Sequence, residues 1–164
     1  IRKALNFGHT IGHALEEFAL QQATLSGGAV VSTAPTNQTT GGAAISARLL
    51  PLARARTAPK KRPLLHGYAV AFGLIGELYM SARKAGFPTE RLHQTARFIR
   101  ENYAQTEFTC NDYPTLLNLM LHDKKNTSGV INFTLLHNIG DIRINQTATD
   151  EEICEALDFI REGY

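Results

Sequence analysis

Cysteine is scarce in this chain, which contains only Cys110 and Cys154 and no CxxC pair. We therefore expect neither a disulfide framework nor a cysteine-based zinc site, and a reducing compartment such as the cytoplasm is the default expectation. The chain also lacks an apolar run of the about 20 residues that a membrane-spanning helix needs, and it shows no signal peptide. These absences favour a protein that works without a membrane.

An excess of charge of one sign is missing as well. The 17 Lys and Arg residues nearly balance the 15 Asp and Glu residues, which gives a net charge of +2. The clearest basic cluster, within residues 54–62, has no interleaved aromatic side chains that would stack on bases. We therefore expect no nucleic acid and no acidic membrane surface as partner.

Length and composition fit one globular domain, because 164 residues with 43% hydrophobic residues suffice for a core. The segment 20–62 departs from this pattern: it is rich in Ser, Thr, Gly, Ala and Gln and then in Ala, Arg, Pro and Lys, without a helical or strand period. We predict a largely disordered insertion at 20–62. The chain starts inside an expected helix and without an initiator Met, so we expect a fragment or the later part of a larger protein.

Outside that segment, hydrophobic periodicity predicts mostly helices. One helix is expected over residues 2–19, a central buried one over 68–84, and a third opens at Pro88. Asp112 is expected to cap a fourth helix that has Pro114 in its first turn.

The C-terminal part of the sequence predicts a small β element and a last helix. Residues 130–136 and 142–144 resemble two short strands joined around Gly140. Thr149 and Glu152 have the spacing of a capping box at the start of a helix. The predicted fold class is therefore mainly α with a small β-hairpin, in a single domain over residues 1–164.

A polar stripe in the first predicted helix is the strongest indication of function. Arg2, Asn6, His9 and His13 are spaced four, three and four residues apart, and Glu16 continues the series. On an α-helix these positions share one face, opposite an apolar face that is suited to a core. A guanidinium, a carboxamide and two imidazoles together suit a metal ion and an anionic or polyhydroxylated ligand.

His66 strengthens the interpretation of this stripe as a metal site. Two histidines four residues apart resemble the HExxH pattern, but Thr10 replaces its glutamate, so spacing alone favours a polar helix face. His66 stands at the start of the most apolar predicted helix, where an imidazole is poor core filler. If the two helices pack together, His9 and His66 meet as two legs of a site for which zinc usually needs a third protein ligand.

Three segments resemble the signatures of one enzyme family. Residues 2–16, RKALNFGHTIGHALE, closely resemble the metal-binding helix of 3-dehydroquinate synthases, and residues 65–73, LHGYAVAFG, resemble a second signature. Residues 123–126, DKKN, followed by Gly129 and by INFTLL at 131–136, resemble the third. The resemblance covers residues 1–19 and 63–164, and it implies the helical C-terminal domain of the dehydroquinate synthase-like fold.

The resemblance assigns roles to individual residues. It implies that His9 and His66 bind a divalent metal, usually zinc, with cobalt as the other candidate. It implies polar and cationic contacts to the substrate from Arg2, Asn6, His13, Lys124 and Lys125. Within that set His13 and Lys124 are the expected catalytic residues, and Lys124 is favoured over Lys125.

The resemblance also implies a reaction and its cofactors. Members of the family convert the sugar phosphate 3-deoxy-D-arabino-heptulosonate 7-phosphate to 3-dehydroquinate and phosphate, in the shikimate pathway. NAD takes a hydride and later returns it, while the metal acts as a Lewis acid and cationic side chains neutralise phosphate and carboxylate groups. The implied full-length enzyme is a cytoplasmic homodimer.

Two parts of that enzyme are not found in this sequence. In the family, a preceding α/β domain supplies the NAD site and a carboxylate metal ligand. We therefore expect this chain to be inactive by itself unless a complementary part binds it. The alternatives are another sugar-phosphate cyclase, a metal-dependent alcohol or glycerol dehydrogenase relative, and a non-catalytic helical fragment.

Overall fold

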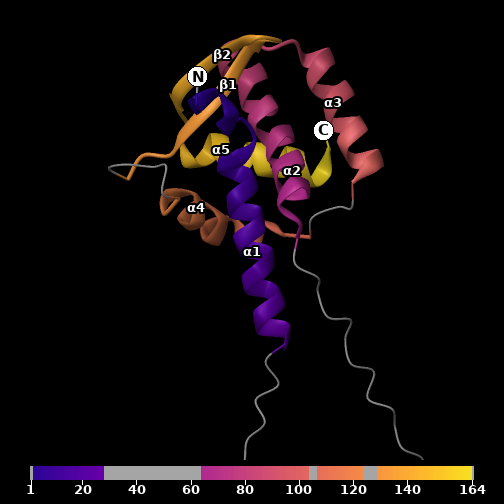
Figure 1. Cartoon of the computed structure of the whole chain (residues 1–164), viewed down its shortest axis with the longest axis vertical. Helices are drawn as coiled ribbons and strands as arrows, with labels where there is room; N and C mark the ends of the chain where they lie inside the picture. Colours follow the sequence, from indigo (N-terminus) through magenta and orange to yellow (C-terminus); the bar gives the residue numbers. More distant parts are fainter. Residues whose placement is uncertain (1, 28–63, 104–106, 124–128, 164) are drawn as a thin grey trace, which may run out of the picture.

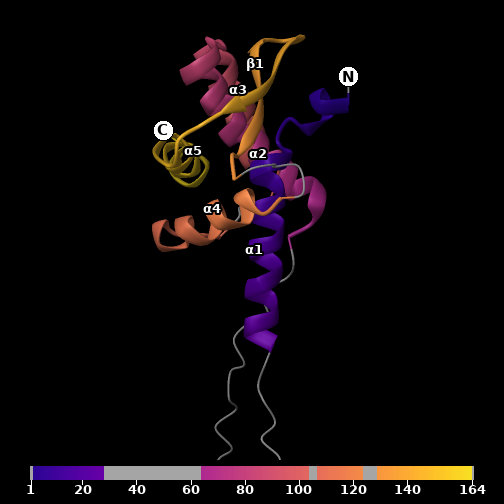
Figure 2. The same cartoon turned by 90° about the vertical axis from the view of Figure 1, so that its left-hand side faces the viewer.

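Two helices, α1 (His9–Gly27) and α2 (His66–Met80), lie side by side at the centre of the molecule (Figures 1 and 2). The structure is a computed structural model that describes residues 2–27, 64–103, 107–123 and 129–163. Within these ranges it contains five α-helices and one two-stranded antiparallel sheet. The predicted class, mainly α with a small hairpin, is confirmed.

The remaining elements surround this central pair (Figure 1). In chain order they are the 3₁₀-helix η1 (Arg2–Asn6), the π-helix η2 (Ser81–Ala85), α3 (Thr89–Asn102), the 3₁₀-helix η3 (Cys110–Asp112), α4 (Tyr113–Leu121), β1 (Asn132–Asn138), β2 (Asp141–Thr147) and α5 (Asp150–Glu162). Helix α4 packs on α1, while α3 and α5 pack on α2. Strand β1 packs on η2 and α2, and both strands of the hairpin contact η1.

Glycines allow α1 and α2 to approach until their main chains touch. A Cβ atom on Gly73 would lie 2.0 Å from the carbonyl oxygen of Gly8 and 2.6 Å from the nitrogen of Gly12. A Cβ on Gly12 would in turn lie 2.9 Å from the Cα of Val70. No side chain fits at such separations, so this close crossing brings the polar start of α1 beside the start of α2.

The first predicted helix is interrupted. Residues 2–6 form η1 rather than an α-helix, and Gly8 turns the chain with a φ of +79° before α1 begins at His9. Glycine adopts this left-handed conformation without the strain that other residues suffer. The predicted continuous stripe is therefore wrong at its N-terminal end: Arg2 and Asn6 lie on η1 and not on the histidine face of α1.

Helix α1 also extends further than predicted. It continues to Gly27, so the prediction of disorder is wrong for residues 20–27. These residues include the good helix formers Leu20, Gln21 and Ala23, and Gln21 donates to Glu17 one turn earlier. The rest of the predicted insertion, residues 28–62, lies outside the described residues.

One apolar core joins the helices and the inner side of β1. Phe72 and Ile75 of α2 are buried against Leu15 of α1 and Leu157 of α5, and Phe133 brings the hairpin into the same cluster. Burial on nearly every side of α2 confirms the predicted central helix. The core therefore holds α2 rigidly beneath the site at its first residue.

Of the two predicted helix caps, the one at the start of α5 is present and the one at the start of α4 is not. The capping box of Thr149 and Glu152 at the start of α5 is confirmed, with both reciprocal hydrogen bonds present. The prediction that the Asp112 side chain caps α4 is wrong, because Asp112 instead accepts from Thr109 and closes a capping box on η3. The 3₁₀ turn before α4 redirects that carboxylate.

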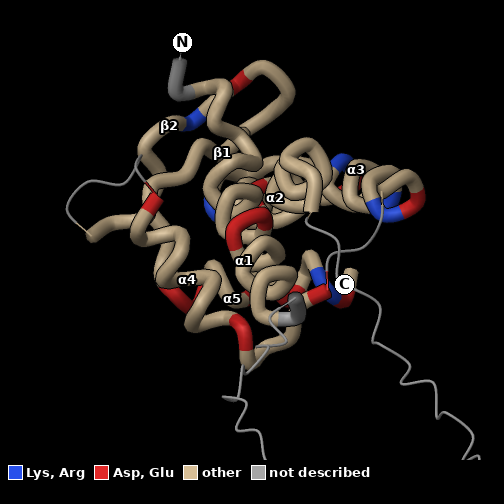
Figure 3. Tube along the Cα trace, turned by 60° about the horizontal axis from the view of Figure 1, so that its bottom comes forward, with Lys and Arg blue, Asp and Glu red and all other residues tan. Residues whose placement is uncertain are grey.

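The two short strands form a hairpin, as the sequence predicts. Strand β1 pairs with β2, with Leu136 opposite Ile142, and the chain turns at Gly140. Acidic and basic positions are scattered among uncharged ones along the described trace (Figure 3), and the first turn of α5 is acidic, with Asp150, Glu151 and Glu152. No helix among the described residues is long and apolar enough to cross a membrane.

Candidate metal centre

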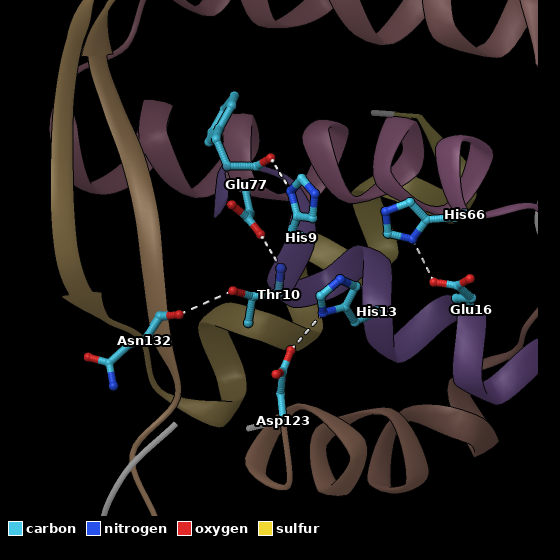
Figure 4. Close-up of polar contacts among 9 residues, drawn as sticks. His9, Thr10, His13, Glu16, His66, Glu77, Asp123 and Asn132 are labelled. Atoms are coloured by element: carbon cyan, nitrogen blue, oxygen red, sulfur yellow. Dashed lines mark hydrogen bonds and ion pairs between the residues drawn. The ribbon is translucent and has the colours of Figure 1, made fainter. Parts of the chain in front are cut away.

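Three histidine rings meet where the start of α1 faces the start of α2 (Figure 4). His9 is the first residue of α1, His13 follows one turn later, and His66 is the first residue of α2. The ring centroids are 5.4 Å apart for His9 and His13, 5.7 Å for His9 and His66, and 5.6 Å for His13 and His66. One potential ligand atom from each ring lies within 4.8 Å of the other two.

Each ring is oriented by an acceptor on its Nδ1 atom. His9 Nδ1 lies 3.1 Å from the carbonyl oxygen of Phe7, His13 Nδ1 lies 2.9 Å from Asp123 Oδ2, and His66 Nδ1 lies 2.8 Å from Glu16 Oε2. All three partners can only accept, so Nδ1 is the donating nitrogen in each ring. The neutral form of this tautomer has its lone pair on Nε2.

This arrangement matches the surroundings of histidines that bind metals. Metal-binding histidines usually donate their second ring nitrogen to a carboxylate or a backbone carbonyl, which fixes the ring and raises its basicity. The cluster has two carboxylates and one carbonyl in these positions. Three imidazoles that present Nε2 to one another are suited to zinc or cobalt.

Solvent reaches the cluster from one side. The His66 side chain is 54% exposed and Glu16 is 37% exposed, whereas Asp123 is only 12% exposed. His13 is intermediate, at 33%. The cluster is therefore anchored in the protein through His13 and Asp123 and is open to solvent at His66.

The predicted site residues divide into three groups. His9 and His66 are brought together, as the sequence analysis expects, and His13 joins them in one cluster. Asn6 is half-buried at the end of η1. The side chain of Arg2, together with Lys124 and Lys125, lies outside the described residues.

Sequence reasoning missed the groups that orient the rings. The sequence analysis names Glu16 only as part of the stripe and Asp123 only within the DKKN segment, yet each one accepts from a histidine. Glu77, which binds the start of α1, was not singled out at all. Its signal in the sequence is a lone carboxylate within the apolar run of α2.

The chain matches a protein-family model over residues 1–41 and 56–126, and that model is described as "3-dehydroquinate synthase C-terminal". The match covers more than half of the chain. It includes parts of the 20–62 segment and leaves out residues 42–55.

Curated relatives carry the same name. A 3-dehydroquinate synthase of Parabacteroides distasonis is 45% identical over the whole chain, which spans 36% of that relative. Enzymes of the same name from Geobacillus kaustophilus and Geobacillus thermodenitrificans are 28% and 26% identical over 99% of the chain, which spans 34% of each. The chain thus spans about a third of the length of the curated relatives it matches.

Proposed function

The chain belongs to the 3-dehydroquinate synthase family, and on that premise we propose that it supplies the metal- and substrate-binding part of this enzyme's active site. The observation that supports the proposal most directly is the cluster of His9, His13 and His66, in which an acceptor orients every ring. The three histidines lie within two of the segments that resemble the family's signatures. The reaction proposed is the conversion of 3-deoxy-D-arabino-heptulosonate 7-phosphate to 3-dehydroquinate and phosphate.

His9 and His66 are proposed to hold a divalent ion, with zinc or cobalt as the candidates. The donor set fits such an ion, because neutral imidazole nitrogens with oriented rings are typical ligands of both metals. When bound, the ion supplies Lewis acidity at an oxygen of the substrate. The two histidines come from different helices, so the close α1–α2 crossing keeps their rings 5.7 Å apart.

His13 is proposed to handle a proton of the substrate. Its Nδ1 lies 2.9 Å from the mostly buried carboxylate of Asp123. A carboxylate on one ring nitrogen orients the imidazole and stabilises its protonated form, as in other base–orienter pairs. Nε2 of His13 then accepts and returns a proton beside the ion-binding histidines.

The anionic groups of the substrate require cationic and polar partners. Arg2, Asn6, Lys124 and Lys125 are proposed for this role, with Lys124 as the catalytic lysine. Guanidinium and ammonium groups stabilise a phosphate dianion as it leaves and also bind a carboxylate. NAD and a further carboxylate ligand are proposed to come from the part of the enzyme that the chain does not match, and the whole enzyme is proposed to work in the cytoplasm as a homodimer.

A chimera tests this function. In the Parabacteroides distasonis synthase, the third that matches this chain is replaced by residues 1–164, and phosphate release from the heptulosonate phosphate is measured with NAD and Co²⁺. We expect release by the chimera and none by the chain alone. His13→Ala in the chimera should lower the rate about 100-fold or more, while cobalt binding is retained. A folded, cobalt-loaded chimera that releases no phosphate would contradict the proposal, and release only from a different sugar phosphate would assign the chain to another cyclase.

A further inference from the structure

Glu77 is a fully buried carboxylate in an apolar part of α2, with 0% of its surface exposed. One carboxylate oxygen, Oε2, accepts from the main-chain N–H of Gly8 at 2.7 Å, and Oε1 accepts from that of Thr10 at 3.1 Å. Burial of a carboxylate carries a large desolvation cost unless hydrogen bonds offset it. The two bonds enclose one residue, His9 (Figure 4).

Glu77 caps the start of α1, where the chain offers no N-cap side chain of its own. The first N–H groups of a helix have no partner within the helix, and a Ser, Thr, Asp or Asn at the N-cap usually accepts from one of them. Here the N-cap position is Gly8, whose carbonyl accepts the first helical bond from Gly12. Glu77 bonds the N-cap N–H and the second helical N–H together, and its charge faces the positive end of the α1 dipole.

A local cap is excluded by the same close crossing that creates the site. A Cβ atom on Gly8 would lie 2.8 Å from Leu74 and 3.0 Å from the carbonyl oxygen of Val70, and the φ of Gly8 is +79°. A side chain at position 8 would therefore push α1 away from α2 and strain the turn. Only a group that reaches across from α2 can cap α1 while the helices stay this close.

From this geometry we propose that Glu77 is the positioning residue for His9, which rests on the proposed function of His9 as a metal ligand. Glu77 fixes the Phe7–Gly8 peptide group, whose carbonyl oxygen orients the His9 ring through Nδ1, and it also fixes the His9–Thr10 peptide group. Thr10 adds a second tie, since its hydroxyl donates to the carbonyl oxygen of Asn132 on the hairpin. Glu77 acts through His9 and touches neither ion nor substrate.

Glu77→Gln tests the role with little change in shape. The amide has one acceptor oxygen in place of two and presents N–H groups to a main-chain donor, so one of the two bonds is lost. We expect the affinity of the chain for Co²⁺ to fall about 10-fold, the lower end of the range for lost outer-shell partners. In the metal-free chain, ¹H–¹⁵N spectra should show that the fixed Nδ1-protonated tautomer of His9 is lost.

Ser81→Ala is the matched control. Ser81 is another fully buried polar residue, one turn after Glu77, and its hydroxyl donates to the carbonyl oxygen of Glu77 and accepts from Leu136 on the hairpin. This variant should lower the free energy of unfolding but leave cobalt affinity and the His9 tautomer unchanged. If Glu77→Gln does not fold, Glu77→Asp, which retains the charge but draws it back by one methylene, is measured in its place.

The outcomes separate this inference from the proposed function. Wild-type cobalt affinity and a fixed His9 tautomer in a folded Glu77 variant would overturn the positioning role. An equal loss of affinity in Ser81→Ala at equal stability would overturn it too, because the effect would then be general. If the wild-type chain binds no cobalt, the proposed metal site fails, and the His9 tautomer in the metal-free Glu77 variant alone decides the positioning role.

Discussion

The two ends of α2 both carry clusters of titratable side chains, but they differ in how these groups are paired. At the first residue, His66 meets His9 and His13, and each ring is oriented through Nδ1. At the other end, η2 and α5 line a surface cavity of about 400 Å³. Its polar lining consists of Tyr79, Arg83, Lys84, Glu152 and Glu155.

Opposite charges neutralise each other at the cavity. Lys84 Nζ lies 2.5 Å from Glu152 Oε2, and Arg83 lies 3.6 Å from Glu155. Burial, followed by the charge of Glu155, raises the pKa of Tyr79, so its hydroxyl stays protonated and donates to that carboxylate. The charged groups that line the cavity are already paired with one another, whereas the three histidines direct potential metal-ligand atoms toward the same place. The comparison teaches that the chemistry of the side chains, and not the volume of a cavity, identifies the candidate site.

The largest expected effect comes from the close crossing of α1 and α2, which places the histidines of the two helices side by side. Gly73→Ala places a Cβ 2.0 Å from the Gly8 carbonyl oxygen, so we expect the free energy of unfolding to fall by about 3 kcal/mol or more. Gly67→Ala is the control, because nothing lies within 4 Å of its Cβ and an alanine favours the helix by about 0.5 kcal/mol. Urea unfolding measures both. Equal stability of the two variants would show that the crossing is not tight.

An intermediate effect compares one carboxylate from each end of α2. Glu16→Gln removes the charge that orients His66, a proposed ligand at the start of α2, so we expect cobalt affinity to fall about 10-fold. Glu155→Gln removes a carboxylate of the cavity and should leave that affinity unchanged. Isothermal titration with Co²⁺ measures both variants. A similar loss in both would mean that net charge, and not the orientation of a ring, governs binding.

The smallest effect belongs to the cavity. A hydrogen bond from Lys84, and then one from the Thr149 main chain, lower the pKa of Glu152. A lowered pKa contributes stability that is complete above the unfolded-state value and is lost as pH falls through the folded-state value. Glu152→Gln should therefore cost about 0.5 kcal/mol at neutral pH, because the group is partly exposed, and nothing at strongly acid pH. A difference that persists in acid would contradict this ion-pair account.

The sequence was sufficient to predict what local pattern and residue chemistry determine. Hydrophobic periodicity predicted the helical class, and the three-residue spacing of Thr149 and Glu152 predicted the capping box of α5. The convergence of His9 and His66, which are far apart along the chain, followed from an imidazole at the start of an apolar helix and from the family resemblance. These features depend on which residue types stand at which spacing.

Tertiary contacts decided what the sequence did not predict. The helix breaks at Gly8, where the main chain of α2 at Gly73 comes into contact. The periodicity of the sequence around Gly8 gives no sign of this contact. Glu77 caps a helix 67 residues or more away along the chain, and Asp123 reaches His13 across 110 residues. No local rule assigns such partners, because they depend on how α1, α2 and α4 pack.

The most direct test of the central claim is a Co²⁺ titration of the chain, followed by the visible absorption of the bound ion. We predict one bound Co²⁺ per wild-type chain. His66→Ala should lower the affinity by more than the about 10–100-fold that loss of an outer-shell partner causes. His122→Ala, at an exposed histidine whose Nδ1 faces the carbonyl oxygen of Asn118, should not change it. Equal affinities for the wild type and both variants would contradict the account.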